Sequence, residues 1–251
     1  MQLAILSGGA AHGLVAALGA RFKAQIGCDI AGIYGAVGAM REKLIAGAPA
    51  DLVILTSALI EGLSRTGHVV PGSAADIGIV HTAIAVRAGD PTPGVGDAVA
   101  LRAALLAADA IYFPDPTLAT AGIHFAKVLD RLGIGAEAAA RLRPHPNGAT
   151  AMRALAEAKE RRPLGCTQVT EILATPGVRL VAPLPRGFEL ATTYTAAVCT
   201  RAALPEQARR LAALLSGPDT RAERERAGFL SLSPSSSMGR GDLNARPGSA
   251  P

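Results

Sequence analysis

The chain has 251 residues and a formal net charge of +5, and 49% of its residues are hydrophobic although only 3% are aromatic. This length supplies enough apolar material for one large domain or two small lobes. A composition rich in Ala, Leu, Val and Gly is typical of a folded α/β protein. The scarcity of aromatic side chains leaves little for bases to stack on, and the arginines of 221–226 alternate with glutamates as on a solvated helix face. We therefore expect no nucleic-acid partner.

No apolar run reaches the roughly 18–20 residues that cross a bilayer, so no membrane insertion is expected. The three cysteines have unrelated spacings, which predicts buried free thiols and no disulfide framework. The sequence has no paired histidines at metal-site spacing, no P-loop and no dinucleotide fingerprint, so we predict no metal and no cofactor. A strand pattern begins at once, without a signal-peptide pattern before it. The protein is therefore expected to be periplasmic if an export signal precedes this sequence, and cytoplasmic otherwise.

Strand and helix patterns alternate along the first third of the chain. Leu14, Leu18 and Phe22 recur at helical spacing after an apolar strand at 3–6, and Gly27 is suited to a C-cap. The pattern continues with a strand at 30–34, a helix at 40–46, a strand at 52–56 and a helix at 57–65. This alternation favours parallel strands joined by crossover helices.

The rest of the chain contains two long strand patterns, at 80–87 and 190–200, on either side of a second α/β series. That series is predicted as a helix at 97–108, a strand at 110–113, helices at 120–132 and 148–160, and strands at 164–167 and 178–181. A last helix begins near Pro205. Two long β segments around a central block predict two lobes joined by two crossings. We expect lobe 1 at 1–82 and 195–230, lobe 2 at 83–194, and a disordered tail at 231–251.

Loops of very small residues precede four of the predicted helices, at 7–13, 35–38, 120–122 and 147–150. Such loops let a ligand touch backbone N–H groups, and a helix N-terminus favours an anion. Four such turns from distant parts of the chain predict one cleft for a small anion. The candidate ligand-binding residues are Ser7, Gly9, Ala10, Ala11, Ala36, Val37, Gly38, Thr120, Ala121, Gly122, Ala149, Thr150 and Gln168. For the hydroxyls of Ser7, Thr120 and Thr150, the alternative is that each satisfies its own turn or helix start.

Several short blocks resemble, in the same order, the periplasmic molybdate-binding proteins, which are type 2 solute-binding proteins of ABC importers. These blocks are Ala-Gly-Ala-Pro-Ala-Asp at 46–51, Ala-Gly-Asp-Pro at 88–91, Asp-Pro at 115–116 followed by Thr-Ala-Gly at 120–122, and Leu-Gly-Cys-Thr at 164–167. The resemblance runs over 3–230. It implies a two-lobed α/β fold, each lobe a mostly parallel sheet flanked by helices, that closes over an anion held by hydroxyls and N–H groups. It also implies an ABC permease as partner, and we expect a monomer.

The sequence departs from that family at three places where the family has ligand side chains. The serine of the first loop corresponds to Ala10, the serine run of the second loop to 35–38, and the tyrosine after the Leu-Gly strand to Gln168. Each lost hydrogen-bond donor costs about 1–3 kcal/mol. We therefore expect a solute-binding protein for a small anion, with carboxylates preferred over molybdate.

An aconitate isomerase is grouped with the same family, which provides an enzymatic alternative. Such an enzyme would move one allylic proton on a tricarboxylate without a cofactor. His12 and His124 each lie one turn into a predicted helix and are the candidate bases. The alternative for both is ordinary packing or surface exposure. Binding and catalysis therefore both stay open at this point.

Overall fold

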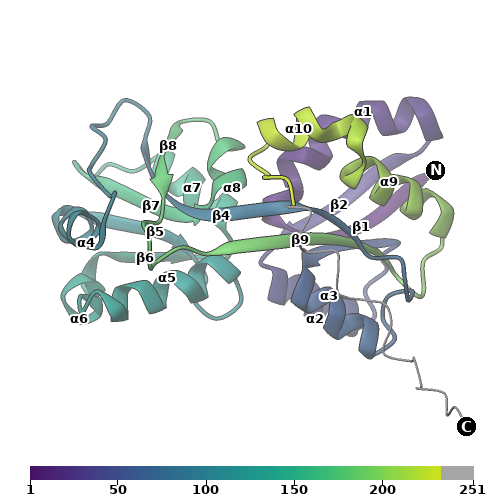
Figure 1. Cartoon of the computed structure of the whole chain (residues 1–251), viewed down its shortest axis with the longest axis horizontal. Helices are drawn as coiled ribbons and strands as arrows, with labels where there is room; N and C mark the ends of the chain where they lie inside the picture. Colours follow the sequence, from purple (N-terminus) through teal and green to yellow (C-terminus); the bar gives the residue numbers. More distant parts are fainter. Residues whose placement is uncertain (233–251) are drawn as a thin grey trace, which may run out of the picture.

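The computed structural model describes residues 1–232 and has two lobes joined by two long strands (Figure 1). The tail predicted at 231–251 lies, from 233 onward, outside the described residues. The elements of the first lobe are β1 (Gln2–Gly8), η1 (Gly9–Ala11), α1 (His12–Ile26), β2 (Asp29–Gly35), α2 (Val37–Ile45), β3 (Leu52–Thr56), α3 (Ser57–Arg65), α9 (Pro205–Ser216), η3 (Pro218–Thr220) and α10 (Arg221–Arg226). Those of the second are α4 (Ala98–Ala107), β5 (Ala110–Pro114), α5 (Thr120–Arg131), α6 (Gly135–Ala138), η2 (Ala139–Arg141), β6 (Leu142–His145), α7 (Gly148–Ala156), β7 (Pro163–Gln168), α8 (Val169–Leu173) and β8 (Val178–Pro183).

The long strands β4 (Ala75–Arg87) and β9 (Ala191–Val198) run between the lobes (Figure 1). The sheet has the order β2-β1-β3-β9-β4-β7-β5-β6, and β8 also pairs with β4. Residues 75–81 of β4 pair with β9, whereas residues 82–87 pair with β7 and β8. The strands β1, β2 and β3 are parallel, as are β5, β6 and β7, and the ladders of β4 and β9 are antiparallel. The expected two-lobed α/β fold is thus confirmed, with one mixed sheet that is continuous through β4.

Each lobe has its own apolar core. In lobe 1 the core joins the inner faces of β1 and β3 to α1 and α9, with Leu6, Phe22, Ile54 and Leu211 among its members. In lobe 2 two clusters cover the opposite faces of the sheet, one around Phe125 and the other around Met152. The lobe boundaries at 82/83 and 194/195 stay a prediction, which this separation of cores supports. None of the described helices is long and apolar enough to cross a membrane.

The block at 46–51 has a structural role through Asp51. Its carboxylate is buried and accepts hydrogen bonds from the Ala4 N–H in β1 and the Leu204 N–H before α9, each at 2.8 Å. One side chain therefore ties three separate segments of lobe 1 together.

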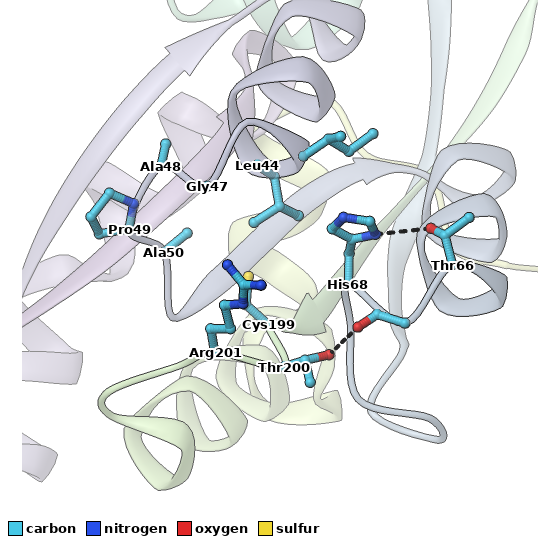
Figure 2. Close-up of a pocket in the computed structure, with 12 residues that line it drawn as sticks. Leu44, Gly47, Ala48, Pro49, Ala50, Thr66, His68, Cys199, Thr200 and Arg201 are labelled. Carbon is cyan, nitrogen blue, oxygen red and sulfur yellow. Dashed lines mark hydrogen bonds between the residues drawn. The ribbon is translucent and has the colours of Figure 1, made fainter.

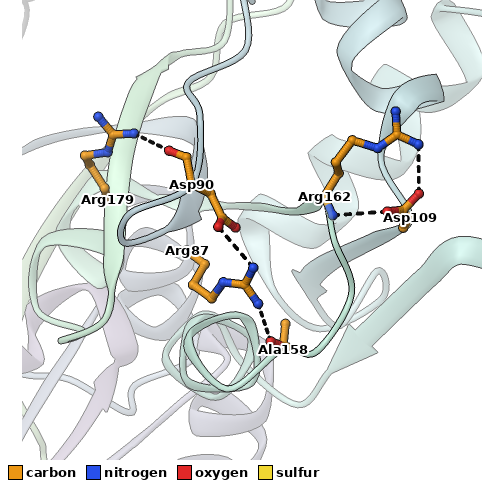
Figure 3. A network of polar contacts seen from close by, with 6 residues as sticks. All are labelled: Arg87, Asp90, Asp109, Ala158, Arg162 and Arg179. Carbon is orange, nitrogen blue, oxygen red and sulfur yellow. Dashed lines mark hydrogen bonds and ion pairs between the residues drawn. The ribbon is translucent and has the colours of Figure 1, made fainter.

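The block at 88–91 anchors the far end of β4 through Asp90 (Figure 3). The Asp90 carboxylate pairs with Arg87 at 3.0 Å, and the backbone carbonyl of Asp90 accepts a hydrogen bond from Arg179 at 2.6 Å. Arg87 also donates to the Ala158 carbonyl after α7. These contacts hold the turn after β4 against β8 and α7, so this block, too, stabilises the fold.

Some element boundaries differ from the sequence prediction. The strand β4 begins at Ala75, five residues before the predicted 80, because its first part pairs with β9 although it contains polar Asp76 and Gly78. The short edge strand β6 was not predicted, since Leu-Arg-Pro-His has no alternating pattern. The helix α2 begins at Val37 and not at 40, which brings its N-terminus directly after the small-residue loop.

Candidate functional site

Three helices begin at one small cavity between the lobes. Ala36 precedes α2, Ala119 precedes α5, and Asn147 precedes α7. The first turn of a helix has N–H groups without intrahelical acceptors, so each start offers donors and a partial positive charge. The residues that line this interlobe cavity are Gly9, Gly35, Ala36, Val37, Pro114, Ala119, Thr120, Ala121, Asn147, Gly148, Gln168, Glu171 and Tyr194. No lysine or arginine occurs among these described lining residues.

Glu171 is the acidic side chain of the interlobe cavity. It lies on the short helix α8 and is 7% exposed. The Thr167 hydroxyl donates to its Oε2 at 2.6 Å. Burial raises the pKa of Glu171, and the Thr167 hydroxyl and the N–H groups of Gln168 and Ala149 lower that pKa in part.

Two glycines make room for this carboxyl group. A Cβ at Gly9 would overlap Oε1 of Glu171, and a Cβ at Gly148 would overlap both Oε2 of Glu171 and the Thr167 hydroxyl. Gly9 belongs to lobe 1, whereas Gly148 and Glu171 belong to lobe 2. The carboxyl group therefore lies where the two lobes meet.

Gln168 and Tyr194 complete the polar lining. Gln168 is 2% exposed, and within the part of the chain that the structure describes neither its amide nitrogen nor its amide oxygen has a hydrogen-bond partner. Burial raises the pKa of the Tyr194 hydroxyl, and the charge of Glu171 raises it further, while the nearby Gln168 amide acts in the opposite direction. A buried amide without partners costs free energy, so a molecule in the cavity that both accepts and donates would relieve it.

The structure describes a closed arrangement of the lobes. The interlobe cavity has a volume of about 20 Å³, which is little more than the roughly 10–15 Å³ that holds one water molecule. The Gly38 N–H in α2 donates to the Leu118 carbonyl before α5 at 3.1 Å, which directly joins the lobes. A ligand larger than water therefore needs the lobes to separate, and β4 and β9 are the strands that would bend.

The structure brings part of the predicted ligand set to the interlobe cavity. The predicted residues that line it are Gly9, Ala36, Val37, Thr120, Ala121 and Gln168. The predicted residues outside the lining are Ser7, Ala10, Ala11, Gly38, Gly122, Ala149 and Thr150. Whether any of them binds a ligand stays a prediction.

Local bonds account for several residues outside the lining. The buried Ser7 hydroxyl donates to the Gly8 carbonyl at 2.9 Å. The Thr150 hydroxyl donates to the Asn147 side chain at 3.0 Å, and the same Asn147 oxygen accepts from the Thr150 N–H at 2.9 Å. Gly122 lies so close to the carbonyls of 114 and 115 that a Cβ would overlap them. In this closed arrangement these groups are bonded or packed within their own turns, and their contact with a ligand stays a prediction.

The two candidate bases do not line the interlobe cavity. His12 is exposed and its ring lies against Tyr34, with ring centroids 4.4 Å apart. The His124 ring lies 2.7 Å from the Phe188 carbonyl, in the segment between β8 and β9. Their catalytic roles stay predictions that this placement does not support.

Sequence reasoning missed Glu171, Pro114 and Ala119 as lining residues, and Asn147 and Gly148 were predicted only as part of the loop 147–150. The first of these had a visible signal, because a glutamate follows the strand 164–167 within a short apolar segment. Tyr194 was interpreted as a structural residue, since an aromatic residue in a strand is ordinary core material, although its place on a strand that crosses between the lobes suggested a position at the hinge.

A second cavity, of about 230 Å³, lies in lobe 1 at the amino end of β3 (Figure 2). His68 bonds to the Thr66 hydroxyl at 2.9 Å, and the Thr200 hydroxyl donates to the Gly67 carbonyl at 2.8 Å. Ligands of open α/β sheets bind at the carboxyl ends of the strands, which is the opposite end of β3. The interlobe cavity is therefore the better candidate site.

The sequence model of the family described as bacterial extracellular solute-binding protein matches residues 3–230. An aconitate isomerase from Pseudomonas sp. is 29% identical over 185 residues, which cover 72% of this chain and 67% of that protein. The periplasmic molybdate-binding protein of Azotobacter vinelandii superposes with a TM-score of 0.77 at 20% identity, over 92% of this chain and 100% of that one. The sulfate-binding protein SubI of Mycobacterium tuberculosis superposes with a TM-score of 0.72 at 17% identity, over 94% and 88%.

Proposed function

The chain belongs to the family of bacterial extracellular solute-binding proteins, and from this premise we propose that it captures a small anion, preferentially a carboxylate, between its lobes. The lobes close over the anion and later release it to an ABC permease, which makes the periplasm the compartment of action. The periplasmic molybdate-binding protein of Azotobacter vinelandii and the sulfate-binding protein SubI have the same fold, which supports an anion as ligand class.

The observation that carries this proposal is the convergence of α2, α5 and α7 on the interlobe cavity. Each helix N-terminus is equivalent to roughly +0.5 elementary charge. Together they favour a small anion without a lysine or arginine, because first-turn N–H groups that are not yet bonded can supply hydrogen bonds. In the closed arrangement some are already used: the Gly38 N–H bonds the Leu118 carbonyl, and the Ala149 N–H bonds Glu171. The small side chains of Ala36 and Ala121 let an anion approach those N–H groups.

The polar lining favours a carboxylate with further polar groups over a bare oxyanion. Gln168 offers one donor and one acceptor, both buried and unpaired. A fully ionised oxyanion can only accept, so it would leave the Gln168 oxygen unpaired at a cost of about 1–3 kcal/mol. A hydroxy acid or a partly protonated polycarboxylic acid can satisfy both groups.

Thermal unfolding with added anions tests the proposal. The panel is molybdate, tungstate, sulfate, citrate, aconitate and malonate. An anion at 100 times its Kd stabilises the protein by about 2.7 kcal/mol, and we expect this rise with at least one carboxylate. Val37→Glu places a negative charge in the first turn of α2, beside the cavity, and should abolish the rise. Val99→Glu is the matched control, because Val99 is in the first turn of α4 and 80% exposed. If no anion raised the Tm, the proposal would be wrong.

A second candidate is a cofactor-free isomerase, which two observations favour. One is the likeness to the Pseudomonas aconitate isomerase, and the other is Glu171 at the interlobe cavity with a pKa raised by burial. An ionised Glu171 would take a proton from the allylic carbon of trans-aconitate as the double bond moves, and return it to the other carbon to give cis-aconitate. Helix N-termini would stabilise charge on the carboxylate.

Proton exchange in deuterated water tests this candidate. Both aconitate isomers are followed by NMR with the wild type, His12→Ala, His124→Ala and Glu171→Gln. Because of their places in the structure, we expect the histidine variants to stay active and Glu171→Gln to lose isomerisation. Turnover no faster than in buffer would leave binding as the remaining candidate.

A further inference from the structure

The interlobe cavity combines two features that oppose each other. Three helix starts favour negative charge, yet Glu171 brings a carboxyl group to the same 20 Å³ space. Two ionised carboxylates, or a carboxylate and an oxyanion, at close range in a buried site disfavour each other strongly. The site therefore needs a proton between Glu171 and whatever anion binds.

We propose that the Glu171 carboxyl group and the bound anion share one proton, so that the cavity selects anions that carry a proton or gain one on binding. This inference rests on the proposed function and specifies its ligand class. An anion with a hydroxyl or a protonated acid group donates to ionised Glu171. An anion without a proton binds only after Glu171 has taken one up and can donate.

The contacts around Glu171 leave its carboxyl group able to share a proton with a bound anion. The carboxyl group accepts from the Thr167 hydroxyl, at 2.6 Å to Oε2, and from the backbone N–H groups of Gln168 and Ala149, while Oε1 lies against the backbone of Gly9 in the other lobe. Beside it, both polar atoms of the Gln168 side chain are buried without partners. An unpaired donor and acceptor next to the carboxyl group indicate a position that a polar ligand completes.

Among residues 1–232, no cationic side chain forms an ion pair or hydrogen bond with Glu171. On the packed elements, Arg153 of α7 donates to the Thr150 hydroxyl, and Arg179 of β8 donates to the Asp90 carbonyl. His12 of α1 lies against Tyr34, and His81 of β4 lies opposite Ala191 in the ladder with β9. Tyr194 of β9 is the titratable neighbour whose pKa responds to Glu171, and burial keeps its hydroxyl neutral. Glu171 is therefore the group that titrates with binding.

Sulfate and monohydrogen phosphate are suitable probes, because they share a tetrahedral shape and a double negative charge but only phosphate carries a proton. Calorimetric titrations are made with the full chain from pH 6 to 9, with sulfate, phosphate and trans-aconitate, in buffers of different ionisation enthalpy. We expect phosphate to bind at least tenfold more tightly than sulfate at pH 8. Above the pKa of Glu171 we expect binding of sulfate and of trans-aconitate to take up one proton, and the sulfate Kd to rise about tenfold per pH unit.

Glu171→Gln presents a permanent donor to the anion. In this variant the sulfate Kd should lose its pH dependence and fall at least tenfold at pH 8, and the advantage of phosphate should disappear. Glu157→Gln, at an exposed position after α7, is the matched control and should behave as the wild type. If Glu171→Gln does not fold, the pH series and proton uptake of the wild type still decide the question.

The outcomes separate this inference from the proposed function. Binding of these anions without proton uptake, with a pH-independent sulfate Kd, would overturn the shared proton but leave anion capture intact. Failure of all three anions to bind the wild type would overturn the proposed function and this inference together.

Discussion

Replacing Gly148 by alanine should disturb both the fold and the interlobe cavity. A Cβ at this position overlaps Oε2 of Glu171 and the hydroxyl of Thr167, so the 2.6 Å hydrogen bond between them cannot persist. A hydrogen bond to a charged group contributes about 1.5–3 kcal/mol. Alanine in a helix recovers at most about 1 kcal/mol relative to glycine. The expected net loss is therefore about 0.5–2 kcal/mol.

Thermal unfolding measures this loss directly. For a chain of this size each 1 kcal/mol lowers Tm by about 2–4 °C, so the variant should melt about 1–8 °C below the wild type. The displaced carboxyl group should also fill the cavity, which has only about 20 Å³ of space, and anion-induced stabilisation should disappear.

Gly94→Ala is the matched control for this substitution. Gly94 is exposed, and a Cβ there meets no atom within 4 Å. The substitution should therefore change the free energy of unfolding by less than about 0.5 kcal/mol, and the Tm of the variant should stay close to that of the wild type. A Gly148→Ala protein that melts with the wild type and still binds an anion would refute the packing described around Glu171.

Three further predictions concern the fold. Asp51→Ala removes the acceptor of two backbone N–H groups, those of Ala4 and Leu204. It should lower the free energy of unfolding, measured in urea, by about 2–4 kcal/mol. An unchanged urea midpoint would contradict the role of Asp51 in joining these segments. Burial raises the pKa of Glu171 above its ordinary value of 4.5, so the folded state holds this proton more tightly than the unfolded chain. The corresponding stability is fully present below pH 4.5 and is lost as the pH rises through the raised pKa; Glu171→Gln should remove this part of the pH dependence in urea titrations, whereas Glu157→Gln should not. Burial and the nearby Asp51 raise the pKa of the Cys199 thiol to about 12, and Cys28 and Cys166 are also buried. A thiol reagent at pH 8 should therefore modify none of the three in the folded protein and all of them in urea, and fast modification of Cys199 before unfolding would be inconsistent with this burial.

The sequence by itself determined the α/β class and the positions of most helices and strands. Hydrophobic periodicity and small-residue loops are local properties, so they could be recognised around Leu14 and Phe22 or before α7 without knowledge of the fold. The prediction that several small-residue helix starts meet at one place also came from the sequence, because successive α/β units put their helix starts at the same edge of a sheet. Gly9, Ala36, Thr120 and Gln168 accordingly line one cavity.

Only the tertiary structure decided which side chains complete that cavity. Glu171 is on a helix of five residues, too short for a periodic pattern that would tell its direction. The space for its carboxyl group comes from Gly9 and Gly148, which are distant in sequence and meet only when the lobes pack. Ser7 and Thr150 were also predicted as ligand residues; in the closed arrangement their hydroxyls bond within their own turns, and contact with a ligand stays a prediction. The sequence shows the same serine or threonine whether its hydroxyl bonds to a neighbouring residue or to a ligand. Only the packed structure fixes which partner is within hydrogen-bond distance.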